Sequence, residues 1–426
     1  MSEAALAPPG SVFHLYASTR AQTESLCEPL EAEDFVIQSM DDVSPPKWHL
    51  AHTTWFFETF VLEAFLPGYK VFDPSFRVLF NSYYESVGDQ HPRNERGFLS
   101  RPSTEKIFEY RRHVDRAVVE LWATNGKPEI RSELERRLVL GIHHEQQHQE
   151  LILMDIKHNF FKNPLWPIYK PAETVGIAHE LQPMKWSRFE GGLATIGAEG
   201  TGLAADGGFA YDNEFPRHQV QLGDFEISNR LVTCSEWMEF IDAGGYEDPS
   251  FWLSDGFATV KAKGWKSPLY WQKEGGQWLL FTVGGIRPIR ENDPVCHVSF
   301  YEADAYARFR GARLPREEEW ERAADGIEVK GELLESEAWQ PTPAKTSELT
   351  QIFGSVWEHT ASPYTPYPSY KAPEGALGEY NGKFMCNQMV SRGGSVFTPA
   401  SHIRKSYRNF FYPHQRWACQ GVRLAK

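Results

Sequence analysis

A single long helix, predicted from Pro128 to about residue 160, limits the possible folds more than any other stretch. Proline suits the first position of a helix. Apolar runs at 138–140 and 151–154 flank the centre, so this helix is too apolar to be solvated all round and has to pack in a core. His144 and His148 lie between these runs, four residues apart, where helical geometry places one side chain above the other. The spacing therefore predicts two ligands for one metal ion.

A third histidine occurs on an earlier predicted helix, residues 47–66. His52 lies within an aromatic stripe that includes Trp48 and Trp55, at spacings of four and three. A lone histidine on an apolar face is more often a hydrogen-bonded core residue, but the candidate metal pair on the other helix favours a ligand. His49, three residues earlier and nearly on the same face, is the competing candidate.

Two further helices are predicted in the first part of the chain. One spans 19–30, and the other follows Ser103, which has the side chain of an N-cap and is followed by Glu105 in the first turn. The inward face of this second helix would carry Ile107, Tyr110, Val114, Val118 and Leu121. Four helices with apolar stripes predict an α-helical bundle, and bundle cores are where facing helices assemble metal sites.

A long non-helical stretch, residues 80–97, separates the second and third predicted helices. Loops of this length in compact domains are usually functional or disordered, and the aromatic content argues against disorder. The stretch contains Tyr83, Tyr84, Arg93 and Arg96. Taken alone, the paired tyrosines are explained by packing, and surface charge is the default explanation for either arginine.

The residue composition and the predicted secondary structure change after the bundle. Prolines at positions 164, 167, 171 and 183 predict a linker at 166–185, between a bundle domain at 1–165 and a second domain at 186–426. The second domain has short strands, many glycines and Trp-rich turns, with helices expected from about residue 301 and at 315–324. The chain is therefore predicted to be an α+β multidomain protein.

Length, charge and cysteine content narrow the class of protein. A chain of 426 residues exceeds what one core usually serves, and its formal net charge of −13 argues against nucleic acid or an anionic membrane as a partner. Five scattered cysteines without a C-x-x-C spacing indicate neither a disulfide framework nor a cysteine zinc site. The N-terminus has no basic segment followed by an apolar one, so a cytoplasmic protein is expected.

Five phrases occur in order in the second domain, at residues 294–300, 311–321, 354–360, 392–395 and 421–424. Together they resemble the formylglycine-generating-enzyme and sulfatase-modifying superfamily, which implies a C-type-lectin-like fold over 186–426. Formylglycine generators use a closely spaced cysteine pair in the C-terminal segment, whereas residues 404–412 contain no cysteine. Formylglycine chemistry is therefore not expected.

The first domain, with its histidines at 49, 52, 144 and 148, resembles a DinB-like metal-binding four-helix bundle. Joined to the lectin-like domain, the whole chain resembles the ergothioneine-biosynthesis sulfoxide synthases. The resemblance implies Fe(II) on three histidines, which fall here on His52, His144 and His148. It also implies an O2-dependent reaction that joins a thiol sulfur to imidazole C2 of hercynine (N-alpha-trimethylhistidine) and oxidises that sulfur to a sulfoxide. Three neutral imidazoles suit Fe(II) and leave positions open for substrates.

The same resemblance assigns residues to hercynine. Gln147 is expected to reach it from the ligand helix, while Asn409, Phe410, Phe411 and Tyr412 are expected to line its pocket from the lectin-like domain. Aromatic faces attract a trimethylammonium group through cation–π interaction.

The resemblance also assigns residues to the sulfur donor and to proton transfer. Arg93 and Arg96 are expected to hold the carboxylate of the donor, and Tyr83 or Tyr84 is expected to be the catalytic proton donor. Some family members place this tyrosine in the lectin-like domain. Members that use γ-glutamylcysteine offer it an acidic group from the C-terminal loop, and residues 409–411 contain no carboxylate. L-cysteine is therefore the expected donor.

Three alternatives stay open. One is the same chemistry with γ-glutamylcysteine, histidine or a selenium donor. Another is a zinc metallopeptidase, because His144-Glu145-x-x-His148 is also the zincin motif, although both x positions are glutamine and no metzincin continuation follows. The third is a non-enzymatic lectin-like binding protein. For the iron site, His52→Ala is expected to remove the metal, and His49→Ala is expected to leave it in place.

Overall fold

The computed structural model describes residues 10–124, 128–171, 182–200 and 208–426. Clustering of contacts divides it into two compact units. Unit 1 comprises Met1–Pro164, Leu203–Phe209 and Ala372–Tyr380, and unit 2 comprises Leu165–Gly202, Ala210–Lys371 and Asn381–Lys426. A segment from far along the chain, Ala372–Tyr380, thus belongs with the bundle. Among the described helices, none is long and apolar enough to cross a membrane.

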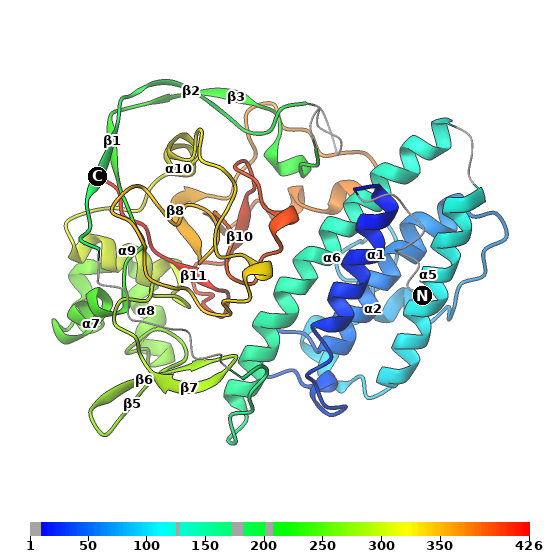
Figure 1. Ribbon diagram of the computed structural model, residues 1–426, viewed down its shortest axis with the longest axis horizontal. Helices are drawn as coiled ribbons and strands as arrows, with labels where there is room; N and C mark the ends of the chain where they lie inside the picture. Colours follow the sequence, from blue (N-terminus) through cyan, green and yellow to red (C-terminus); the bar gives the residue numbers. More distant parts are fainter. Residues whose placement is uncertain (1–9, 125–127, 172–181, 201–207) are drawn as a thin grey trace. The chain divides into compact units, whose positions relative to one another are not determined.

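Four long helices frame the described part of unit 1 (Figure 1): α1 Val12–Ser25, α2 Pro46–Phe57, α5 Thr104–Thr124 and α6 Pro128–Lys162. Helix α6 packs on α1 and α2, and α2 also packs on α5. The predicted bundle is confirmed, but its first helix covers 12–25 rather than 19–30. The early start follows from Ser11, whose side chain caps the helix by accepting a hydrogen bond from the His14 amide at 3.2 Å.

The predicted helix at 47–66 is not continuous. A π-helical turn, Glu58–Leu62, separates α2 from the short helix α3 Glu63–Phe65. The Glu58 carboxylate is buried here and accepts hydrogen bonds from the hydroxyls of Tyr69 at 2.6 Å and Tyr110 at 2.5 Å. Such turns widen a helix locally and often occur near functional sites.

The close approach of α6 to α2 depends on a glycine. A Cβ atom added at Gly141 would lie 2.4 Å from Cε1 of Phe57, so any larger residue would push the two helices apart. Gly141 lies about one turn before His144 on α6. The glycine therefore lets the face of α6 that carries His144 approach α2 closely.

The third predicted helix is confirmed as α5. Ser103 caps it by accepting a hydrogen bond from the Lys106 amide at 3.2 Å. The residues predicted to face inward are all buried: Ile107, Tyr110, Val114, Val118 and Leu121. Beyond α3, the stretch between α2 and α5 holds one more short α-helix, α4 Phe76–Leu79, and the 3-10 turn Arg93–Phe98.

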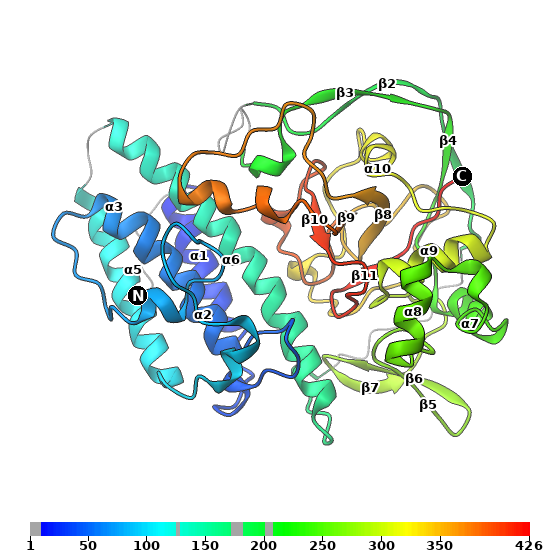
Figure 2. The ribbon, with the colours of Figure 1, turned by 180° about the vertical axis from the view of Figure 1, so that it is seen from behind.

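Unit 2 is built on a four-stranded sheet in the order β10-β9-β8-β11 (Figure 2). Its strands are β8 Trp357–Pro363, β9 Met389–Arg392, β10 Asn409–Phe411 and β11 Gln420–Gly421. Strand β11 runs parallel to β8, whereas the other pairs are antiparallel. The described helices of this unit are α7 Cys234–Asp242, α8 Ser254–Lys263, α9 Phe300–Phe309 and α10 Glu317–Ala323, of which the last two match the helices predicted near 301 and at 315–324.

Smaller sheets complete unit 2. Two two-stranded antiparallel ribbons pair β1 Trp186–Phe189 with β4 Phe225–Ser228 and β2 Gly192–Ile196 with β3 His218–Leu222. A three-stranded sheet has the order β5-β6-β7, with bounds Trp271–Glu274, Gln277–Thr282 and Gly285–Pro288. Ile196, Leu222 and Phe225, which lie on these ribbons, belong to one hydrophobic core cluster of the unit.

The sequence phrases that identified unit 2 build its buried ion pairs. Arg423 donates two hydrogen bonds to Glu358, at 2.7 and 2.8 Å, and Trp320 donates a third at 2.8 Å. Arg392 and Arg408 both contact Glu317 in the same core. A buried charge is tolerated only when it is paired and hydrogen-bonded. These ion pairs therefore help to hold the core of unit 2 together.

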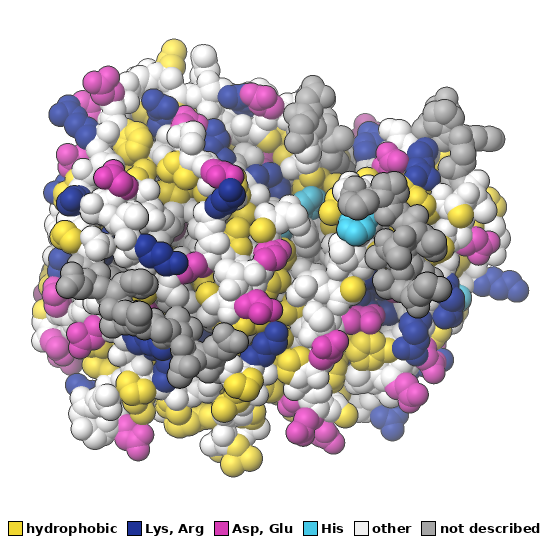
Figure 3. Space-filling view, in the orientation of Figure 1, with side chains coloured by type: hydrophobic (Ala, Val, Ile, Leu, Met, Phe, Trp, Pro, Cys, Tyr) yellow, Lys and Arg dark blue, Asp and Glu magenta, His cyan; other side chains and the backbone are white. Residues whose placement is uncertain are grey.

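Charges on the surface are mixed in sign. On the face that Figure 3 shows, basic and acidic side chains are interspersed rather than gathered into one basic field. Among the described side chains of this face, no large basic field is presented to a polyanion.

Candidate metal centre

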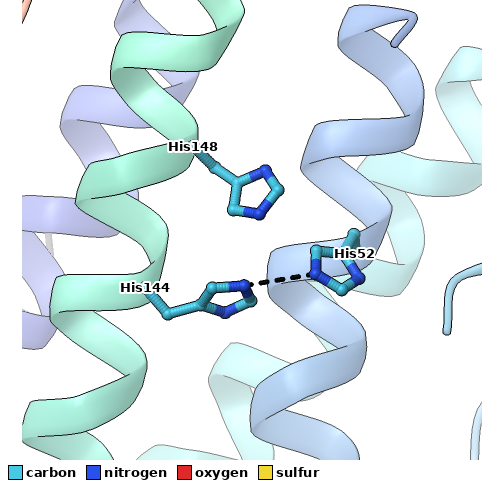
Figure 4. A group of neighbouring side chains, drawn as sticks. All are labelled: His52, His144 and His148. Atoms are coloured by element: carbon cyan, nitrogen blue, oxygen red, sulfur yellow. Dashed lines mark hydrogen bonds between the residues drawn. The ribbon is translucent and has the colours of Figure 1, made fainter. Parts of the chain in front are cut away.

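Three histidines from two helices of unit 1 converge at one point (Figure 4). His52 projects from α2, and His144 and His148 project from α6, with one ligand atom of each within 4.8 Å of the others. The Nε2 atoms of His52 and His144 are 3.2 Å apart. The predicted trio is thus brought together, and this group contains His52 rather than His49.

All three rings are buried among aromatic side chains. Their residues are 0, 1 and 7 % exposed in sequence order, and His52 is stacked between Trp48 and Trp55. Burial lowers the pKa of His144 to about 3. Burial also holds the pKa values of His52 and His148 well below the ordinary histidine value, and the neighbouring His144 lowers both further. The imidazoles are therefore neutral at pH 7, which is the form that binds a metal.

Hydrogen bonds fix which nitrogen of two of these rings faces the centre. His52 Nδ1 lies 2.6 Å from the carbonyl oxygen of Phe80, which can only accept, so the proton is on Nδ1 and the lone pair is on Nε2. His148 Nδ1 lies 2.8 Å from Nδ1 of His49, and Nε2 of His49 lies 2.9 Å from the carboxylate of Asp155. Because the carboxylate accepts from His49 Nε2, His49 Nδ1 accepts from His148, and Nε2 of His148 is left for a metal.

This arrangement fits a bound divalent ion. A metal-binding histidine generally donates its second N–H to a carbonyl or carboxylate, directly as in His52 or through a relay as in His148. The Asp155 carboxylate is itself held by the backbone amide of Ser44 at 2.8 Å. Three neutral nitrogen ligands suit a first-row divalent metal and leave coordination positions for other ligands.

We expect His49→Ala to weaken metal binding by about 10- to 100-fold, the usual cost of losing a residue that orients a metal ligand. The reason is that His148 would lose the acceptor that fixes its proton on Nδ1. This revises the sequence-based expectation that His49 can be replaced without effect. Competition with a chelator measures the affinity. The half-exposed His143 gives a matched His→Ala control on α6, and equal affinities in both variants would contradict the relay.

Glu145 would act as the general base in a metallopeptidase, but its carboxylate forms ion pairs with two arginines instead. It is fully buried, and its two carboxylate oxygens contact Arg20 at 2.9 Å and Arg111 at 3.0 Å. Burial alone raises the pKa of this carboxyl, but the two guanidinium groups outweigh it and lower the pKa to about 2. A general base needs a pKa near the working pH and a lone pair directed at the reacting water. This geometry argues against the zincin interpretation.

Arg96 lies close to the histidines and has an unusual environment. Its guanidinium lies 3.4 Å from the ring centroid of Trp48, which is stacked on His52. Arg96 donates hydrogen bonds to the hydroxyls of Ser44 at 2.9 Å and Ser82 at 3.0 Å, while its Nε is buried without a hydrogen-bond partner. Burial, and then the nearby Arg93, hold the pKa of Arg96 well below its ordinary value. A buried cation bonded to neutral groups favours the binding of an anion.

The other predicted arginine behaves differently. Arg93 is exposed and donates a hydrogen bond to the carbonyl oxygen of Asp42 at 2.5 Å. It is near enough to Arg96 to affect its pKa. Two neighbouring guanidinium groups, one exposed and one buried, would therefore contribute unequally to binding the same carboxylate.

A tyrosine that the sequence reasoning missed lies beside the histidines. The ring of Tyr380 is 5.7 Å from that of His144, and its hydroxyl donates a hydrogen bond to the side-chain oxygen of Gln147. Its ring is also 6.1 Å from that of Tyr83, which is in turn stacked on Tyr84 at 4.6 Å. The structure thus adds Tyr380 to the two predicted tyrosines and joins it to the predicted Gln147.

The residues expected to line the substrate pocket from the lectin-like domain lie in unit 2. Asn409, Phe410 and Phe411 form β10, and Tyr412 follows it. Phe410 is stacked on Tyr364 with ring centroids 4.0 Å apart, and Tyr412 is 44 % exposed. Their part in binding a substrate stays a prediction.

Comparison with known proteins supports the two-part organisation. Residues 15–152 match the DinB superfamily, and residues 178–347 and 336–426 match the sulfatase-modifying factor enzyme 1-like domain. The predicted fold class, a DinB-like bundle followed by a formylglycine-generating-enzyme-type domain with α+β structure, is therefore confirmed. All three converging histidines lie within the DinB match.

Three curated relatives match this chain over half of its length or more. A hercynine oxygenase of Mycolicibacterium smegmatis is 32 % identical over 68 % of this chain and 71 % of its own length. A hercynine oxygenase of Mycobacterium tuberculosis is 29 % identical over 96 % of this chain and 97 % of its own length. Ergothioneine biosynthesis protein 1 of Schizosaccharomyces pombe is 26 % identical over 51 % of this chain and 28 % of its own length. With its histidine centre in a DinB-type bundle and its sulfatase-modifying-type domain, this chain belongs to the hercynine oxygenase family of ergothioneine biosynthesis.

Proposed function

We propose that this oxygenase is an iron(II)-dependent sulfoxide synthase that joins the sulfur of L-cysteine to imidazole C2 of hercynine and gives hercynylcysteine sulfoxide. One C–H and one S–H bond are lost, the C–S and S–O bonds form, and O2 supplies one oxygen to sulfur and the other to water. The stoichiometry closes without another reductant. The observation that carries the proposal is the centre of three neutral histidines, in a chain of the hercynine oxygenase family.

The metal and the protein have separate tasks in this proposal. When bound by His52, His144 and His148, Fe(II) would supply one-electron redox chemistry and open positions for O2 and a thiolate. The buried aromatic walls around these histidines would exclude water from the reacting groups. A protein carboxylate ligand is not needed, since the cysteine thiolate brings negative charge.

Arg96 is the proposed carboxylate site for the sulfur donor. Its buried guanidinium lacks a carboxylate hydrogen-bond partner among the described side chains, so an entering carboxylate would relieve the cost of burying it. Arg93, more exposed, would add attraction at the outer side of the same anion. Phe410, Phe411 and Tyr412 are the proposed hosts of the trimethylammonium group, together with Asn409.

Tyr380 is the proposed proton donor, in preference to Tyr83 or Tyr84. Its hydroxyl is oriented by Gln147, which lies beside His148 on the ligand helix, and its ring contacts His144. The Tyr380 hydroxyl, held beside the three histidines, would donate a proton to the reacting groups and keep solvent from doing so. Gln147 would thus orient Tyr380 as well as contact hercynine.

Tyr380→Phe should lower kcat by about 100-fold or more while KM for both substrates stays within about twofold, since a general acid is lost but its ring packing is kept. Steady-state O2 consumption and product formation measure both constants. Tyr83→Phe is the matched control. A larger kcat loss in Tyr83→Phe than in Tyr380→Phe would transfer the role to Tyr83.

The proposed reaction is tested by anaerobic reconstitution of the purified chain with Fe(II), followed by addition of O2, hercynine and cysteine. Mass analysis should find hercynylcysteine sulfoxide, with one O2 consumed per product. Cysteine sulfinic acid as the sole product would instead make the protein a thiol dioxygenase. Absence of bound iron and of substrate-dependent O2 uptake would favour a non-enzymatic binding protein.

L-cysteine should be the preferred sulfur donor, because β10 and the residue after it offer no carboxylate to the glutamyl amine of γ-glutamylcysteine. The expected kcat/KM for cysteine exceeds that for γ-glutamylcysteine by about tenfold or more, the effect of one unpaired charged group. A clear preference for the dipeptide would contradict the assignment. Histidine in place of hercynine, and selenocysteine in place of cysteine, are the competitors to measure in the same assay.

A further inference from the structure

A second group of metal-type ligands lies in unit 2, outside the histidine centre. Cys296, His297 and Cys419 are 3, 0 and 1 % exposed, and one ligand atom of each lies within 4.8 Å of the others. We propose that these residues form a structural zinc site, distinct from the iron centre and independent of the reaction proposed for it. Their spacing in the sequence, over more than a hundred residues, explains why no local cysteine motif indicated it.

The two segments that carry these residues pack closely against each other. A Cβ atom added at Gly421 would lie 2.6 Å from the carbonyl oxygen of Val295, so the chain on either side of the cysteines makes a contact that only glycine allows. The backbone of Cys419 is also held, because its carbonyl accepts a hydrogen bond from the Trp357 amide at 2.9 Å. The ligands are therefore positioned by the sheet rather than by a mobile loop.

His297 has a backbone conformation and a hydrogen bond that favour a ligand role. Its φ of +62° lies in the left-handed region, which is strained for a non-glycine residue and is concentrated at functional sites. Its Nδ1 lies 3.1 Å from the carbonyl oxygen of Trp417, which can only accept. The proton is therefore on Nδ1, and Nε2 carries the lone pair, as in histidines that bind a metal through Nε2.

A fourth ligand is available from Gln340. Its side-chain amide lies 3.5 Å from Sγ of Cys296, while the other end of the amide, Oε1, is buried without a hydrogen-bond partner. The two ends of an amide have nearly the same shape, and a half-turn exchanges them. The turned amide presents its oxygen to the group, which completes a set of two sulfurs, one nitrogen and one oxygen.

Charge and geometry select zinc among the thiophilic ions. Two thiolates with Zn²⁺ sum to zero, whereas Cu⁺ would leave one negative charge in a group that is almost fully buried. Ligand atoms of a tetrahedral zinc site lie roughly 3.3–3.8 Å apart, as follows from bond lengths of about 2.3 Å to sulfur and 2.0 Å to nitrogen. Closing the present group around the ion thus requires movements of about 1 Å or less.

The test measures the zinc and iron content of the purified chain. Purified wild-type protein should contain about one zinc per chain besides iron, by elemental mass spectrometry. His52→Ala should lose iron and keep zinc, and the double variant Cys296→Ser, Cys419→Ser should lose zinc and keep iron. Cys27→Ser, at a buried cysteine of unit 1, is the matched control and should keep both metals.

Binding of Co²⁺ can be measured optically in protein that keeps both cysteines. This test therefore does not require the double cysteine variant to fold. Metal-free His52→Ala protein, titrated with Co²⁺, should develop a thiolate-to-cobalt charge-transfer band in the near ultraviolet with a stoichiometry of about one. Absence of this band, or of zinc from the wild type, would overturn the site. Copper in place of zinc, or zinc retained by the double cysteine variant, would overturn it as well.

Discussion

His52→Ala should abolish the oxygenase activity and lower the bound iron to less than about one tenth of the wild-type content, because two histidines on one helix are left where three ligands are needed. His52 is the only member of the trio that comes from α2, so its loss removes one side of the centre. Iron is measured by elemental analysis and activity by O2 uptake with hercynine and cysteine.

Two controls separate loss of a ligand from loss of the fold. His52 is stacked between two tryptophans, so the variant leaves a cavity, and its thermal unfolding has to be compared with that of the wild type. Exogenous imidazole fits that cavity and should restore part of the iron binding. Wild-type iron content in His52→Ala, with loss of iron in His49→Ala, would make His49 the ligand instead.

The sequence alone could predict what depends on local spacing. Two histidines four residues apart on α6 and an aromatic stripe around His52 follow directly from helical periodicity, and in the structure both lie where that periodicity places them. The buried ion pairs of unit 2 explain why its phrases are recognisable: Glu358 and Arg423 each need the other in the core.

Contacts between distant segments could not be predicted in this way. Tyr380 is 233 residues from Gln147, its hydrogen-bond partner, and periodicity holds no information about that pairing. The one available signal was a tyrosine near Gly378 and Gly382 in a long irregular stretch, the same kind of signal that drew attention to residues 80–97.

The role of His49 shows a second limit. Spacing places His49 and His52 on nearly the same face of α2, and either could be the ligand. What separates them is Asp155, more than a hundred residues away, which accepts a hydrogen bond from His49 and turns it into the support of His148. The choice between ligand and supporting residue is made by tertiary hydrogen bonds.

Glu145→Gln should destabilise the bundle by about 3–5 kcal/mol, because it leaves the buried guanidiniums of Arg20 and Arg111 without their shared carboxylate. Urea unfolding followed by the helical circular dichroism signal measures the loss. Glu135→Gln, on the same helix, is the matched control: its ion pair with Arg131 is solvent-exposed and should contribute less than about 1 kcal/mol.

The effect of Glu145 should depend on pH in a defined direction. Its pKa is lowered from an ordinary 4.5 to about 2 in the folded chain, a shift that corresponds to roughly 3 kcal/mol. A depressed carboxyl pKa contributes stability that is present above the unfolded-state pKa and is lost as the pH falls towards the folded value. The difference between wild type and Glu145→Gln should therefore be largest near neutral pH and shrink between about pH 4.5 and 2.

The Glu145→Gln variant also distinguishes between the two interpretations of the His-Glu-x-x-His motif. If Glu145 were the general base of a peptidase, Glu145→Gln would leave stability nearly unchanged and remove catalysis. If it joins α1, α5 and α6 through its two arginines, the variant loses stability but, at a temperature where it stays folded, retains its iron and most of its oxygenase turnover. Peptide hydrolysis by the wild type that is lost in Glu145→Gln without loss of stability would return the centre to the hydrolytic interpretation.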